Sequence, residues 1–146
     1  MNPAAAGTPP GARRHRVLLV REWEQQTTGC GCGGMESEHD RAAGAGSADC
    51  RADMEAMGAI YRALRKELPR IDVQIVDPRN LTFLIPGMVA DARRGGASWG
   101  EALRELPRGC GQGAIVVDGH VVSSGLIPSA DDAVDLVLRQ LAASTS

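Results

Sequence analysis

The sequence predicts an α/β domain built on a four-stranded mixed sheet with flanking helices. Short apolar runs typical of strands alternate along the chain with longer segments in which apolar residues recur every three or four positions. Near the C-terminus the dipeptide Asp118-Gly119 joins two further apolar runs, a pattern typical of a β-hairpin. At 146 residues the chain fits one such domain, which can bury a core without disulfide bonds.

The first strand is expected within residues 16–23, where Val-Leu-Leu-Val at positions 17–20 forms an apolar run without strict alternation. Such a run suits a strand that is buried on both faces of a sheet. Residues 24–47 are rich in glycine and have no hydrophobic period, so we expect a long irregular loop. Residues 1–15 are rich in Ala, Pro and Gly and then basic, and we expect them to form a disordered leader before a domain that spans residues 16–142.

The next segments predict a helix and a second strand. Ser47 is the expected N-cap, and the helix should end before Pro69. Its apolar residues recur at spacings of three and four: Met54, Met57, Tyr61, Leu64 and Leu68. A strand is expected at residues 71–76. Strand, helix and strand in this order predict a parallel βαβ unit with a right-handed crossover.

The C-terminal half should add two helices, the hairpin and a last helix. A helix is expected from Leu81 to the Gly95-Gly96 pair, kinked or started late because of Pro86. Ser98 and Glu101 are spaced as a capping box for a short helix, and residues 107–113 are rich in turn residues. Ser129 is the expected cap of the last helix, and residues 143–146 should fray.

Composition argues against several partners. The net charge is −2, with 16 basic and 18 acidic residues, and only 3% of residues are aromatic, so nucleic-acid binding is not expected. No apolar run approaches the ~20 residues of a membrane span, and the N-terminus lacks the apolar core of a secretory signal. We therefore expect a cytoplasmic protein without membrane contact. Thiols are kept reduced in the cytoplasm, so the clustered cysteines of this chain indicate metal binding or catalysis.

The element order over residues 16–142 resembles the βαβαββα core of the thioredoxin-like superfamily. The hairpin region, residues 113–128, followed by a capped helix, is especially similar to small thioredoxin-like and glutaredoxin-like proteins, including the arsenic-metallochaperone type. Redox-active members carry Cys-x-x-Cys at the start of the first helix and a cis-proline before the third strand. This chain has Cys30-Gly31-Cys32 in the preceding loop and the sequence Gly-Cys-Gly-Gln-Gly at positions 109–113 before the hairpin.

The resemblance implies where the cysteines lie. In such a sheet the first and third strands are antiparallel neighbours. The loop that leaves the first strand and the loop that enters the third strand therefore lie at the same end of the sheet, and the first helix begins at that end too. Cys30, Cys32, Cys50 and Cys110 would then converge on one edge of the molecule.

A thiol-disulfide oxidoreductase is the first function that these cysteines predict. Cys50 lies near the expected helix start, where the N-terminal amides lower the pKa of a thiol, although Asp49 and Asp53 act against this. A disulfide between Cys30 and Cys32 would be strained and readily reduced. This hypothesis makes these three cysteines catalytic and Cys110 resolving or supporting. It needs no cofactor, and its partners are protein thiols or disulfides.

The same cysteines leave two alternatives open. Four thiolates at Cys30, Cys32, Cys50 and Cys110 can hold an iron–sulfur cluster or zinc, and thioredoxin-like ferredoxins are similar in fold and cysteine number. Three convergent thiolates would bind zinc, cuprous copper or arsenite, as the metallochaperone resemblance suggests. The second alternative is a scaffold without catalysis that acts through protein interactions, since a fold does not fix a function.

Overall fold

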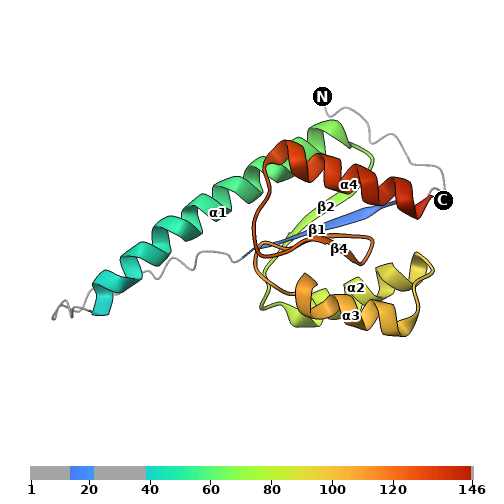
Figure 1. Cartoon of the computed structure of the whole chain (residues 1–146), viewed down its shortest axis with the longest axis horizontal. Helices are drawn as coiled ribbons and strands as arrows, with labels where there is room; N and C mark the ends of the chain where they lie inside the picture. The colour runs from blue at the N-terminus through green and yellow to red at the C-terminus, as the bar shows by residue number, and fades with distance from the viewer. Residues whose placement is uncertain (1–13, 22–38, 146) are drawn as a thin grey trace, which may run out of the picture.

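The computed structural model describes residues 14–21 and the backbone of residues 39–145, with side chains from residue 51 onward in the second range. Within these residues the element order is β1 (Arg16–Val20), α1 (His39–Glu67), β2 (Asp72–Val76), α2 (Leu81–Arg94), α3 (Trp99–Gly109), β3 (Ile115–Val117), β4 (His120–Ser123) and α4 (Ala130–Ser144). The strands form one four-stranded mixed sheet between layers of helices (Figure 1). The expected α/β class is confirmed.

The sheet has the strand order β2-β1-β3-β4. β1 is parallel to β2 and antiparallel to β3, and β3 and β4 form the antiparallel hairpin. The ladder between β1 and β3 continues beyond the strands, because Val20 N–H donates to the Ala114 carbonyl at 2.9 Å and Gly113 N–H donates to the Val20 carbonyl at 2.8 Å. The C-terminal end of β1 therefore lies inside the sheet, beside the residues that lead into β3.

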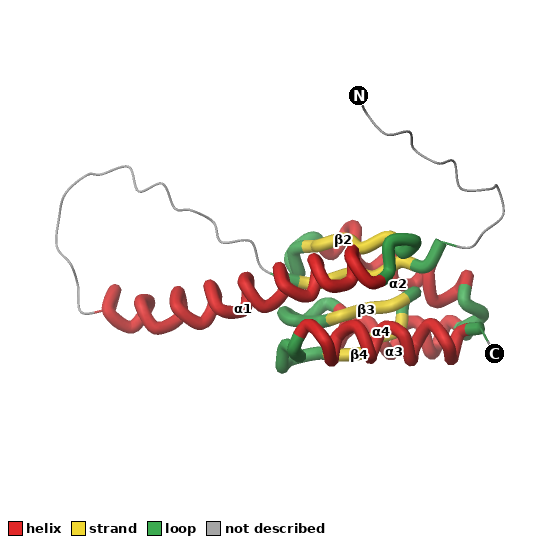
Figure 2. The backbone as a smooth tube through the Cα atoms, turned by 90° about the horizontal axis from the view of Figure 1, so that it is seen from above, coloured by secondary structure: helices red, strands yellow, loops and turns green. Residues whose placement is uncertain are grey.

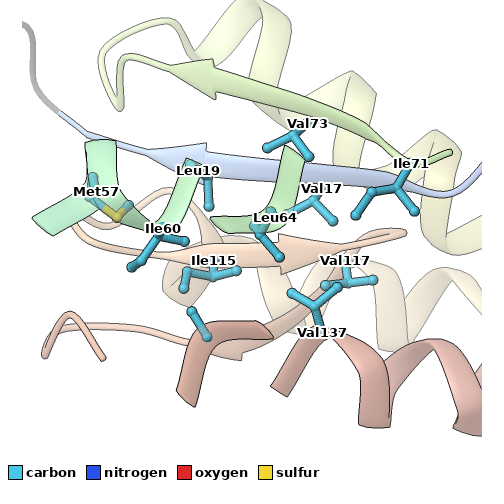
Figure 3. Close-up of a cluster of buried hydrophobic side chains, with 11 residues drawn as sticks. Val17, Leu19, Met57, Ile60, Leu64, Ile71, Val73, Ile115, Val117 and Val137 are labelled. Carbon is cyan, nitrogen blue, oxygen red and sulfur yellow. The ribbon is translucent and has the colours of Figure 1, made fainter. Parts of the chain in front are cut away.

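Both faces of β1 are buried, which explains its continuous apolar run. Val17 and Leu19 belong to the cluster under α1 and α4, whereas Leu18 and Val20 belong to the cluster under α2 and α3. Figure 1 shows these helix pairs on opposite faces of the sheet, and Figure 2 gives the view from above, with α1 and α4 nearest the viewer. Figure 3 shows side chains of the first cluster, which includes Met57, Ile60 and Leu64 from α1, Ile115 and Val117 from β3, and Val137 from α4.

Local signals near the C-terminus are confirmed in detail. Asp118 and Gly119 have φ angles of 49° and 84°, as a two-residue hairpin turn with two left-handed positions requires. Ser98 Oγ accepts the Glu101 N–H, and the Glu101 carboxylate accepts the Ser98 N–H at 2.7 Å, so the capping box is formed. Ser129 Oγ likewise accepts an amide of α4, as its position predicts.

Prolines interrupt the helices less than the sequence suggests. α2 begins at Leu81 and contains Pro86, so this proline does not delay its start. α3 passes through Pro107 and ends at Gly109, where a turn-rich stretch is expected. A proline near a helix end removes only one backbone donor, and the following turn still closes because Cys110 N–H donates to the Leu106 carbonyl at 2.9 Å.

The start of α1 corrects the sequence prediction. The helix begins at His39, about two turns before the expected cap at Ser47. Residues 39–47, expected inside the loop of residues 24–47, are therefore helical, and the rest of that loop up to residue 38 lies outside the described residues. This segment contains alanines, which favour helix, but its two glycines and lack of apolar residues resemble a loop.

Candidate functional site

The candidate site is the end of the sheet at which β1 leaves it. We call this end the β1 exit and define it by Val20, Arg21 and Gly113. The hydrogen bond between Gly113 and Val20 joins the loop entering β3 to this point, and the Arg21 guanidinium donates to the Met54 carbonyl of α1 at 3.1 Å. The neighbourhood of these two loops, which the resemblance implies, is thus present in the structure, and α1 passes the same end (Figure 1).

Cys110 lies at the β1 exit, as the C-cap of α3. Its side chain is half-buried and packs with Leu106 and Val121 against the apolar cluster between the sheet and the α2–α3 layer. Burial raises the pKa of the Cys110 thiol, because the thiolate would lose its hydration there. Cys110 is consequently a protonated thiol at neutral pH and a weak nucleophile.

Glycines on either side fix the position of Cys110. A Cβ atom on Gly109 would lie 2.7 Å from the sulfur of Met88, so α3 packs closely against this side chain of α2 at Gly109. Gly113 has a φ of +76°, in the region that favours glycine, and it is the residue that pairs with Val20. All described peptide bonds are trans, including those that lead into β3.

Cys50 lies well inside α1 and not at its start. The first-turn amides of α1, which carry the positive end of the helix dipole, belong to the residues after His39, about three turns away. The expectation that Cys50 lies at the N-terminus of a helix is therefore wrong. The Cys50 backbone lies about one turn before Met54 in α1, so the two residues are roughly 6 Å apart along the helix axis. Met54 is the residue whose carbonyl accepts the hydrogen bond from Arg21.

The structure brings two of the four predicted site positions to the same end of the sheet. Cys110 packs into the cluster under α2 and α3, whereas the Cys50 backbone belongs to α1, which packs on the other face of the sheet through Met57 and later residues. Cys30 and Cys32 lie outside the described residues, in the segment that leaves the β1 exit. Convergence of all four sulfurs stays a prediction. Among the side chains that the structure describes, no group of three or more His, Cys, Asp or Glu residues could hold a metal ion.

A charged cluster at the opposite end of the sheet was not anticipated from the sequence. Asp91 is 4% exposed and accepts a hydrogen bond from Arg16 Nε at 2.7 Å, while Arg94 reaches its other oxygen. Asp118 accepts the Arg16 backbone N–H and lies 2.6 Å from His15 Nδ1. The only sequence signal is an aspartate on the apolar side of α2. The opposite charges in this cluster neutralise one another. Its hydrogen bonds join β1 to α2 and to the hairpin.

Comparison of the chain with protein-family models, with curated proteins and with solved structures gives no match. In the part of the chain that the structure describes, each helix is too short or too polar to cross a membrane.

Proposed function

We propose that this chain is a thioredoxin-like thiol–disulfide exchange protein in which Cys30 and Cys32 form the redox-active pair. The observation that carries the proposal is the position of the β1 exit. It lies in the interior of the sheet, between a parallel and an antiparallel neighbour, and the segment that bears both cysteines leaves from it. Ligands of open α/β sheets bind at such carboxyl ends of strands. The strand order and element order agree with the core that the sequence resembles.

The environments of the other two cysteines support this choice of pair. Cys110 is a protonated, half-buried thiol, so it suits a supporting or late resolving role better than the first attack. Cys50 lacks the helix N-terminus that was expected to activate it. The nucleophile therefore belongs to the Cys30-Gly31-Cys32 sequence, and Cys50 and Cys110 are not required for one cycle of exchange.

The exchange balances within the pair. One thiolate attacks a disulfide of a partner protein and forms a mixed disulfide, and one partner sulfur leaves as a thiolate and takes up a proton. The second cysteine then loses its proton and attacks the mixed disulfide, which releases the partner as a dithiol and leaves Cys30 and Cys32 joined. Two electrons pass to the partner. The strain of a ring with one intervening residue makes this disulfide easy to reduce again.

Binding of a soft metal is the second proposal for the same cysteines. Cys50 and Cys110 come to the same end of the sheet as the exit of the Cys30–Cys32 segment, which favours a shared site for an iron–sulfur cluster, zinc, cuprous copper or arsenite. The elements that carry them, α1 and α3, pack on opposite faces of the sheet, which argues against it. An interaction scaffold without catalysis is the remaining alternative.

Single cysteine variants test the assignment. Each protein is equilibrated in glutathione buffers of stepped potential, its thiols are alkylated, and mass spectrometry reports the fraction that lost two thiols. The wild type, Cys50→Ser and Cys110→Ala should show the same two-electron transition. Cys30→Ser and Cys32→Ser should lose it. If Cys30→Ser retains the transition and Cys50→Ser loses it, the redox pair is assigned to the wrong residues.

A further inference from the structure

The outer side of α3 carries apolar residues in its first half and arginines in its second half. Trp99 and Leu103 lie about one turn apart and are 60% and 53% exposed. Arg104 and Arg108 lie one turn apart on the adjoining strip of the helix and are exposed too. We call these four residues the α3 outer face. The sheet and α2 pack against other sides of α3, so none of the described elements covers this face (Figure 1).

The arginines of the α3 outer face are available to a partner. Arg104 and Arg108 form no ion pair with the side chains that the structure describes. Both carboxylates of α3 are held by backbone amides. Glu101 is hydrogen-bonded to Ser98, which lowers its pKa more than the charge of Arg104 does, and Glu105 accepts a backbone N–H of β4 at 3.0 Å. A binding partner that supplies carboxylates would therefore complement this face.

The outer side of α4 has the opposite order of side chains. Asp131 and Asp135 lie about one turn apart in its first half, and Leu138 and Ala142 lie on the same strip in its second half. All four are exposed, Leu138 by 44%. We call these four residues the α4 outer face. The two aspartates form no ion pair within the described part of the chain, and the buried residues of α4 lie on the opposite side of the helix.

The two outer faces are complementary to each other. We propose that the α3 outer face of one copy of this chain binds the α4 outer face of a second copy, with the two helices antiparallel. This orientation places the apolar half of one face against the apolar half of the other, and the two arginines against the two aspartates. The faces also match in length, because each spans roughly 14 to 16 Å of its helix axis.

The position of the two faces determines the kind of assembly. α3 and α4 belong to layers on opposite faces of the sheet, so the contact joins different surfaces of the two copies (Figure 1). A pair held in this way keeps one α3 outer face and one α4 outer face free, and further copies add head to tail. One helix face per copy is a small interface, so the chain should be monomeric at low micromolar concentration and associate at higher concentration. This proposal does not depend on the proposed thiol chemistry.

Charge reversal on each face tests the proposal. Sedimentation equilibrium under reducing conditions, at stepped concentrations up to near-millimolar, should give the wild type an average mass that rises beyond twice the 15.3 kDa of one chain. Arg104→Glu combined with Arg108→Glu should weaken association by on the order of tenfold or more, and so should Asp131→Lys combined with Asp135→Lys. An equimolar mixture of the two double variants should associate again, because each supplies the face that the other lacks.

Two further variants separate this contact from unspecific association. Arg62→Glu combined with Lys66→Glu makes the same charge change one turn apart on the exposed side of α1, and should leave the wild-type association unchanged. Leu103→Ala keeps every charge and should weaken association several-fold. A wild-type monomer throughout the concentration range would overturn the proposal. Association that stops at a dimer, or that survives charge reversal on both faces, would overturn it too.

Discussion

At the scale of single residues, Cys110 illustrates how burial raises the pKa of a cysteine at the candidate site. It follows the last turn of α3 and packs against the cluster that contains Val20 and Met88. Burial favours the neutral thiol, so the pKa of Cys110 is raised. The position of Cys110 beside the β1 exit could be predicted from the sequence, because Cys110 lies a few residues before the hairpin. Its burial could not, because that depends on the contact that Gly109 permits between α3 and Met88.

The raised pKa of Cys110 predicts slow alkylation. In a chain with Cys30, Cys32 and Cys50 replaced by serine, iodoacetamide at neutral pH should modify folded Cys110 several-fold more slowly than the same chain in urea. The rate for the folded chain should go on rising with pH after the rate in urea has levelled off, because the folded thiol ionises at higher pH. Equal rates and equal pH profiles in the two states would contradict the burial of this thiol.

Asp91 is the second residue whose role depends on burial. Its carboxylate joins Arg16 of β1 to α2 and is 4% exposed, whereas its other partner Arg94 is largely in solvent and adds little. Removing one member of a buried pair leaves the other charge without compensation.

Asp91→Asn should therefore lower the free energy of unfolding by roughly 2–4 kcal/mol, less than for a fully buried pair because Arg16 retains some exposure. Urea unfolding measures the change. Asp135→Asn, on the exposed side of α4, is the matched control and should stay within about 0.5 kcal/mol of the wild type. A loss as small as that of the control would show that Asp91 does not stabilise the contact between β1 and α2.

At the scale of elements, the strands and caps follow from local sequence, and the limits of the helices do not. Some features depend only on residues within a few positions of each other and can therefore be predicted from the sequence. They are the hairpin at Asp118-Gly119 and the caps at Ser98 and Ser129. The start of α1 has no such signal. Ser47 is a good cap by type, yet the helix continues through it to His39, which moves Cys50 away from the helix start.

The hairpin turn also carries a tertiary constraint on Gly119. A Cβ atom there would lie 2.5 Å from the Ala92 amide nitrogen and closer still to the Met88 carbonyl oxygen, so the turn rests directly on α2. The φ of +84° adds backbone strain for any other residue.

Gly119→Ala should accordingly lower the free energy of unfolding by roughly 2–4 kcal/mol, through strain and through separation of the hairpin from α2. Gly100→Ala supplies the control, since that glycine lies within α3 with open space around it. It should leave stability unchanged or raise it by about 0.5–1 kcal/mol. Thermal unfolding of the two variants compares them. Similar stabilities for both would refute the close contact between the turn and α2.

At the scale of the whole molecule, the sequence predicts the architecture better than it predicts the site. Alternating periodicities predict the mixed α/β sheet because each strand and helix must bury its apolar side against a neighbour. The site depends on which faces of the sheet carry the cysteines. Cys50 and Cys110 come to one end of the sheet on elements that pack against opposite faces, a relation that spacing along the chain does not encode. The charged cluster around Asp91 was missed for the same reason.

We propose that Cys30 and Cys32 exchange disulfides without a metal. Wild-type protein purified without air is assayed for iron and zinc, its visible spectrum is recorded, and its thiols are counted before and after oxidation by glutathione disulfide, with peptide mapping of any new bond. We predict a metal-free, colourless protein that reversibly loses two of its four thiols and joins Cys30 to Cys32. A stoichiometric metal released only on denaturation, or four thiols that all resist oxidation, would contradict this account.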